Sequence, residues 1–128
     1  MKFTAVKTDM PLDEVNAKME AHAKEHTFGV LHSYLFQEIL ESKGFPIQRD
    51  VRVYEVCNPK GAQAMLTNVP QLSALLPCRI SVYEEDGQTV ISTIDLEELI
   101  GSLDVSDELC QSAKAIYQNL LNILNSFE

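Results

Sequence analysis

Two cysteines, Cys57 and Cys78, have the residue type and the placement to do chemistry in this chain. Cys57 ends an alternating stretch and stands directly before Asn58-Pro59, where asparagine suits a helix N-cap and proline the first helical residue. The partial positive charge at a helix N-terminus lowers the pKa of a nearby thiol and favours the reactive thiolate. A thiolate here would suit redox chemistry, contact with a ligand or binding of a soft metal.

The second cysteine opens another predicted strand, directly after Pro77. If the two strands are antiparallel neighbours, the end of the first lies beside the start of the second and the thiols meet, whereas parallel strands would separate them. Strand alternation predicts that Cys57 and Cys78 point into the same layer. The alternative is that both fill tight packing positions near strand ends, as buried free cysteines usually do. The absence of a Cys-x-x-Cys spacing argues against a thioredoxin-type dithiol or a zinc ribbon.

A carboxylate lies on the same strand as the first cysteine. Glu55 falls between Val53 and Cys57 on one strand face, so partial burial would raise its pKa and suit a general acid or base. The alternative is that this face is exposed near the end of the strand, or that Glu55 pairs with Arg52 or Arg79, because buried carboxylates normally have partners.

Other polar side chains gather around the same two segments of sequence. Tyr54, Tyr83, Arg79 and Asn58 could line a pocket for a small polar or anionic ligand near the helix N-terminus. Packing between strands is the simpler explanation, and for Asn58 the cap alone is a sufficient structural role.

Two histidines stand four residues apart in a predicted helix. The spacing of His22 and His26 would aim both rings at one metal ion, with Glu25 or His32 to complete the site. Ala23 stands where the metalloprotease pattern requires glutamate, which disfavours that chemistry. The alternative places both histidines along the edge of an amphipathic helix. We expect no metal site and no cofactor, with this pair as the one metal candidate.

Charge and composition exclude several classes of partner. The 128 residues carry a formal net charge of −9, which repels phosphate backbones and anionic lipid surfaces. No stretch approaches membrane-spanning length, and the N-terminal apolar run is too short for a signal peptide. Three cysteines are an odd number and too few for a secreted disulfide scaffold. We therefore expect a cytoplasmic protein with reduced thiols, without nucleic-acid or membrane partners.

The periodicity of apolar residues and the turn signals predict a two-layer α+β domain with a mainly antiparallel sheet, spanning residues 1–128. Asp86-Gly87 predicts a hairpin turn, and Asp95 a cap. The expected strands cover residues 1–7, 28–36, 51–57, 78–84 and 88–94. The first expected helix begins near Pro11. The other expected helices and helical turns cover residues 37–43, 59–68, 71–76, 95–101 and 106–127.

Residues 53–62 and 75–84 resemble the domain of unknown function 302 family, with Cys57-Asn58-Pro59 and Leu76-Pro77-Cys78 as the most specific parts. The likeness extends over roughly the middle two thirds of the chain. It implies one sheet in a fold similar to the TATA-binding-protein type, with the order β-α-β-β-β-β-α, often as a homodimer. It implies no settled reaction, and similar folds carry unrelated functions.

The sequence favours a small protein that responds to thiol chemistry or binds a small molecule at Cys57, Asn58 and Cys78, acting as a homodimer. One alternative is an enzyme that acts on a small metabolite through Glu55 or a cysteine thiol. Another is a structural dimerisation module without a small-molecule site. The chain has no serine-histidine-acid arrangement, phosphate-binding glycine loop or dinucleotide fingerprint, and whether it catalyses a reaction is open at this point.

Overall fold

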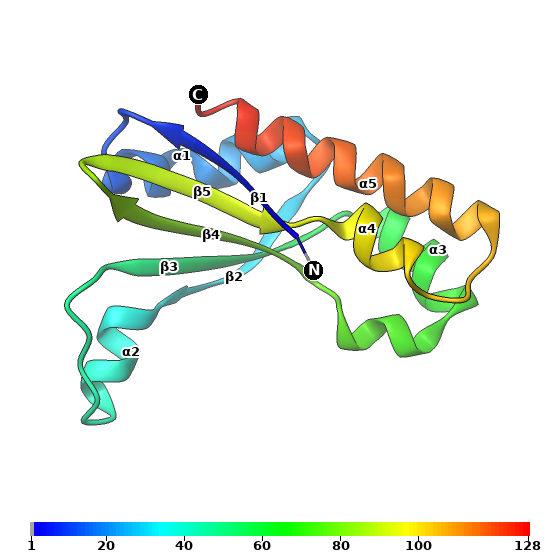
Figure 1. Cartoon of the computed structure of the whole chain (residues 1–128), viewed down its shortest axis with the longest axis horizontal. Coiled ribbons are helices and arrows are strands. Elements are labelled where there is room, and N and C mark those ends of the chain that lie inside the picture. Colours follow the sequence, from blue (N-terminus) through cyan, green and yellow to red (C-terminus); the bar gives the residue numbers. More distant parts are fainter. Residues whose placement is uncertain (1) are drawn as a thin grey trace.

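The computed structural model describes residues 2–128, in which strands and helices alternate along the chain (Figure 1). The predicted elements are present, most of them within two residues of the expected bounds. In chain order they are β1 (Phe3–Thr8), α1 (Leu12–Glu25), β2 (Gly29–Leu35), α2 (Phe36–Ser42), β3 (Val51–Cys57), α3 (Pro59–Asn68), the 3-10 helix η1 (Pro70–Ala74), β4 (Cys78–Glu85), β5 (Gln88–Ile94), α4 (Leu96–Gly101) and α5 (Asp107–Asn125).

The strands form one five-stranded sheet in the order β1-β5-β4-β3-β2, and every neighbouring pair is antiparallel. The β4–β5 hairpin turns at Asp86 and Gly87, whose φ angles of 52° and 80° are both positive. Glycine adopts such angles freely and aspartate does so more readily than most residues, which is why this pair makes a tight turn. The predicted hairpin is confirmed.

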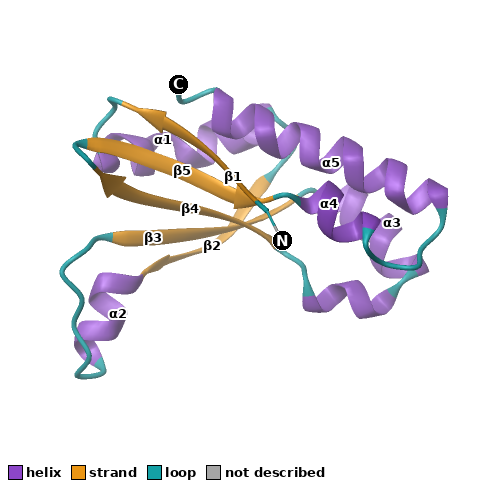
Figure 2. Ribbon diagram, in the orientation of Figure 1, coloured by secondary structure: helices purple, strands orange, loops and turns teal. Residues whose placement is uncertain are grey.

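Helices α1 and α5 lie on one side of the sheet, and α2 lies on the other side near the end of β2 and the start of β3 (Figure 2). The core lies between the sheet and the helices α1 and α5, and its side chains have almost no surface exposed to solvent. Each buried side chain of this size adds roughly 1.5–3 kcal/mol to stability relative to an exposed one. The core includes Val15, Met19, Val56, Ile80, Val82, Ile91, Leu120, Ile123 and Leu124.

Short polar side chains fix where the helices next to the sheet begin. Asn58 Oδ1 accepts a hydrogen bond from the Gly61 amide at 2.9 Å, and Asp95 Oδ1 accepts one from the Glu98 amide at 2.9 Å. These caps satisfy amides that have no partner within the helix. Helix α3 therefore begins at Pro59, directly after its cap Asn58, as the sequence predicts.

The α+β class and the antiparallel sheet are confirmed. The shorter helices α2, α3, η1 and α4 are inserted into the expected order of one strand, a helix, four strands and a final helix. Likeness to the TATA-binding-protein type of fold stays a prediction. Within residues 2–128, no helix is both long enough and apolar enough to cross a membrane.

Candidate functional site

The pairing of β3 with β4 brings the two cysteine-containing segments together at one end of the sheet. The strands are antiparallel, and Val56 stands opposite Cys78 while Glu55 stands opposite Arg79. Cys57 is therefore the next residue along from the partner of Cys78. The expectation that the two cysteines are neighbours depended on this strand arrangement, which the structure contains.

The two cysteines do not share a face of the sheet. Cys78 opens the series that continues with the fully buried Ile80 and Val82, on the side of α1 and α5. Its partner Val56 is buried on that side, so alternation turns Cys57 to the opposite side with Glu55. The prediction that both cysteines point into the same layer is wrong. Cys57 stands one position beyond Val56, the partner of Cys78, and a difference of one residue places a strand position on the other face of the sheet.

Both cysteines are free and partly buried, and both line one small cavity at the strand ends. This cavity has a volume of about 20 Å³, enough for about one water molecule. Its other lining residues come from β3, α3, α5 and the segment before β4, and they are almost all apolar. The two cysteines thus border one small cavity at the strand ends, which is too small for an organic molecule.

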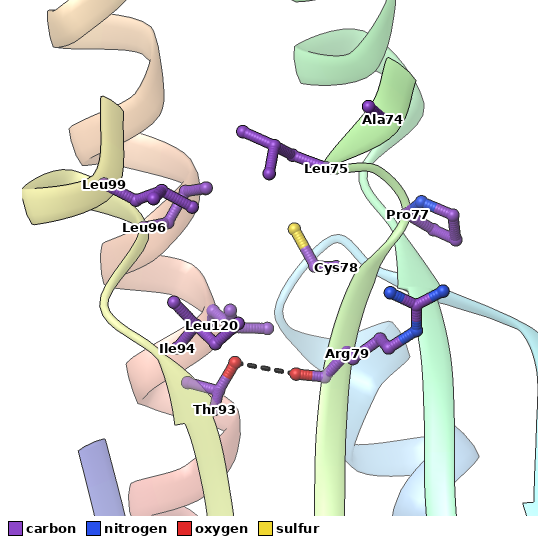
Figure 3. Close-up of a pocket in the computed structure, with 10 residues that line it drawn as sticks. All are labelled: Ala74, Leu75, Pro77, Cys78, Arg79, Thr93, Ile94, Leu96, Leu99 and Leu120. Carbon is purple, nitrogen blue, oxygen red and sulfur yellow. Dashed lines mark hydrogen bonds between the residues drawn. The ribbon is translucent and has the colours of Figure 1, made fainter. Parts of the chain in front are cut away.

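A larger apolar pocket lies on the other side of Cys78, with a volume of about 120 Å³ (Figure 3). The Cys78 sulfur points into it, towards the side of Leu96 and Leu99, while the Arg79 guanidinium points away. The Thr93 hydroxyl in the wall is already engaged, because it donates a hydrogen bond to the Arg79 carbonyl at 2.7 Å. The walls are Ala74, Leu75, Pro77, Cys78, Arg79, Thr93, Ile94, Leu96, Leu99 and Leu120.

Burial, with a smaller contribution from the nearby Cys57, raises the pKa of the Cys78 thiol from its ordinary value of 9.0 to about 11. A thiol with this pKa is protonated at neutral pH, and a protonated thiol behaves as a small, polarisable apolar group. The pocket therefore contains an uncharged sulfur that can contact an apolar ligand, and it offers no thiolate nucleophile at neutral pH.

We expect iodoacetamide to modify Cys78 about a hundredfold more slowly in the folded protein than in denaturant at pH 8. The thiolate is the reacting species, and a two-unit rise in pKa lowers its fraction about a hundredfold. The folded-state rate should increase as the pH rises towards 11. Mass spectrometry of the digested protein would resolve Cys57, Cys78 and Cys110. A Cys78 rate above that of the unfolded chain would contradict the protonated state.

Glu55 is held by two partners on the opposite face of the sheet. Its carboxylate accepts a hydrogen bond from the Tyr34 hydroxyl at 2.7 Å and one from the Arg79 guanidinium at 3.2 Å. The hydrogen bond to Glu55 raises the pKa of Tyr34. Of the readings open for Glu55, the ion pair with Arg79 is the one present, while Arg52 pairs with Asp13 and Asp50.

The polar cluster expected around the helix N-terminus is dispersed. Tyr54 is 3% exposed and donates its hydroxyl hydrogen bond to Asn16 on the side of α1. Tyr83 lies on the opposite face, where the Arg49 guanidinium stands 5.8 Å above its ring. The prediction that Tyr54 and Tyr83 line one pocket is wrong, because their positions in paired strands differ in parity.

Asn58 has its side chain fully engaged at the start of α3. Besides capping the helix, it donates a hydrogen bond to Thr27 Oγ1 at 2.8 Å. It borders both the small cavity and an open groove of about 630 Å³ between α3 and α5. The structural role of Asn58 is therefore plain, and it does not reach the apolar pocket beside Cys78.

The two candidate metal-binding histidines have separate structural contacts. The His22 ring stacks on Phe127 with ring centroids 4.1 Å apart, and its Nδ1 lies 2.7 Å from Ser126 Oγ. The backbone amide of His26 closes the end of α1 by donating to the Ala23 carbonyl at 3.0 Å, and the next amide, of Thr27, donates to the Lys24 carbonyl at 3.2 Å. In the described part of the chain, no three His, Cys, Asp or Glu side chains are grouped as a metal would require.

The sequence interpretation missed most of the pocket wall and one of the two partners of Glu55, Tyr34. Leu96, Leu99 and Leu120 come from α4 and α5, far along the chain from Cys78, and no local pattern links them to it. Tyr34 could have been found only from the register of β2 on β3, which contains an irregularity between Val30 and His32. The site therefore depends on tertiary packing more than on motif residues.

The fold and the pocket define a small α+β domain with an apolar cavity at one end of an antiparallel sheet. The family model described as "Domain of unknown function DUF302" matches residues 4–127, and the chain belongs to this family. The chain is also similar to a solved structure described as an uncharacterised conserved protein DUF302 from Bacillus stearothermophilus. The two share 28% sequence identity with a TM-score of 0.91, over 100% of this chain and 99% of that one. The search of curated proteins found no match.

Proposed function

We propose that the chain is a small-ligand-binding protein, whose ligand places an apolar group in the pocket beside the protonated Cys78. The single observation that carries this proposal is a formed cavity of about 120 Å³ with an almost wholly apolar wall. For comparison, an engineered apolar cavity of about 150 Å³ stays free of water and binds benzene. A pocket of this size fits one aromatic ring or a short branched alkyl group.

The contacts at the other candidate residues support binding rather than catalysis. The Glu55 carboxylate is paired with Tyr34 and Arg79, and its side chain is only 13% exposed. Cys78 is protonated, and the cavity that Cys57 and Cys78 both line is only about 20 Å³. An enzyme that uses Glu55 or a thiol would first have to separate these groups. The three free cysteines fit the reducing cytoplasm that the sequence predicts.

Benzene tests the proposal because it matches the pocket in size and has no polar group. A ligand that binds only the folded state stabilises it by RT ln(1 + [L]/Kd), which is about 1.4 kcal/mol at ten times Kd. Denaturant unfolding with and without benzene would measure the gain. Benzoate, with the same ring and a negative charge, should give no gain. If benzene at its solubility limit leaves the free energy of unfolding unchanged, the proposed function fails.

The proposal includes a homodimer, as the family resemblance implies. Supporting it, the sheet face away from α1 and α5 carries a row of rings in which His32 and Tyr34 lie 4.5 Å apart and Tyr34 and Phe36 lie 6.0 Å apart. Aromatic side chains of this kind are enriched at protein interfaces. Sedimentation velocity would measure the mass of the particle. A dimer that does not bind benzene would favour a structural dimerisation module instead.

A further inference from the structure

A second apolar cavity, of about 370 Å³, adjoins the pocket beside Cys78. Leu75, in the segment between η1 and β4, lines both cavities, so the two cavities are neighbours at this residue. Leucine side chains on exposed segments change rotamer within nanoseconds. The two cavities can therefore join into one elongated space. The second cavity is lined by Val69, Gln71, Leu72, Leu75, Leu103, Asp104 and Val105.

Exposed apolar side chains are concentrated around these two cavities. Six large apolar side chains are exposed in residues 2–128, and Leu75, Ile94 and Leu103 among them line one cavity or both. A fourth, Phe3, is the cross-strand partner of Ile94. An apolar surface that gathers in one place, next to a cavity, indicates a binding site rather than chance exposure.

The charges in the walls restrict the polar end of a ligand. The second cavity is bordered by Gln71 and Asp104, and no Lys, Arg or His lines it. Arg79 is the one basic residue lining the pocket beside Cys78, and its guanidinium points away and pairs with Glu55 (Figure 3). An anionic head group would therefore face Asp104 without a compensating cation, whereas an amine or a hydroxyl can donate to Asp104 and Gln71.

We infer that the ligand is an elongated alkyl amphiphile with a neutral or positively charged head group. Its tail fills the pocket beside Cys78, its chain passes Leu75, and its head lies near Gln71 and Asp104. This inference rests on the proposed function, because it takes the pocket as the binding site. It adds the class of ligand and assigns the second cavity to the same site.

An alkyl series tests the inference separately from the proposed function. Titration of 15N-labelled protein by NMR would give Kd for the n-alcohols from butanol to octanol. Each added methylene should increase affinity about three- to fourfold, because burial of one methylene is worth about 0.8 kcal/mol. Octylamine should bind at least as tightly as octanol, and octanoate at least about tenfold more weakly. If affinity stops rising at butanol while benzene still binds, the inference fails and the proposed function stands.

A substitution in the second cavity tests whether the alkyl chain of the ligand extends into it. Leu103→Trp puts a bulky ring where the head-group end of the ligand should lie. Leu103 is 41% exposed, so the fold should tolerate the change. Octanol affinity should fall at least about tenfold, while benzene affinity should not change. The control is Leu31→Trp, the same substitution at an exposed position on β2. Unchanged octanol binding to Leu103→Trp would overturn the inference.

Discussion

Leu120→Ala is expected to lower the free energy of unfolding by about 2–5 kcal/mol. Leu120 is 1% exposed on α5 and forms part of the wall of the pocket beside Cys78. The substitution removes buried methyl groups and leaves a void that the surrounding helix and sheet close only in part. The loss of stability therefore combines the transfer free energy of the removed atoms with the cost of the remaining cavity. Equilibrium denaturation would measure the loss. Leu31→Ala, at a position that is 63% exposed, should stay within about 0.5 kcal/mol of the unmodified protein.

The same substitution has a second expected result that depends on the pocket. Leu124→Ala, at a fully buried position of the same helix that does not line the pocket, should cost a similar amount. Benzene should restore part of the stability of Leu120→Ala, because that void extends an existing site, and it should restore less in Leu124→Ala. Equal restoration in both variants, or none in either, would mean that Leu120 does not border a ligand site.

Cys78→Leu is expected to weaken benzene binding at least about tenfold. The Cys78 sulfur points into the pocket, and a leucine there occupies volume that the ring needs (Figure 3). The substitution adds carbon to a packed region and should cost about 1–3 kcal/mol of stability, so folding is checked first by the dispersion of the NMR spectrum. The change in Kd would be measured by titration at one temperature.

Two further variants separate loss of space from loss of the thiol. Cys78→Ala removes the sulfur but opens the pocket, so benzene binding should be kept or strengthened. Cys110→Leu makes the same change of residue type at a partly buried cysteine that does not line the pocket, and binding should not change. If Cys78→Leu binds benzene as tightly as the unmodified protein, the ligand does not occupy this pocket.

The sequence predicted those elements best that begin or end at a strong local signal. The bounds of β3, α3 and β5 agree with the prediction because Asn58-Pro59 fixes one junction and Asp86-Gly87 fixes another. The 3-10 helix η1 starts at Pro70, one residue before the expected turn, and ends at Ala74. Proline fixes its own φ angle and is accepted in the first turn of a helix, so the break after α3 is also the start of η1.

The sequence predicted the candidate site only where the pairing of neighbouring strands determines which residues meet. The contact of Glu55 with Arg79 and the proximity of the two cysteines follow from β3 lying beside β4. The faces could not be predicted, because they depend on a register that differs by one residue between the two possibilities. The pocket itself needs Leu99 and Leu120 to meet Cys78, and their meeting depends on how α4 and α5 pack on the sheet.

The position of bound benzene tests the central claim most directly. In a sample of the protein saturated with benzene, nuclear Overhauser effects would report which protons lie within about 5 Å of the ring. The account predicts contacts to the methyl groups of Leu96, Leu99 and Leu120 and to the β-protons of Cys78. Contacts to the opposite sheet face, at Tyr34 or Val53, would contradict it, and so would a saturated sample without contacts to any of the four pocket residues.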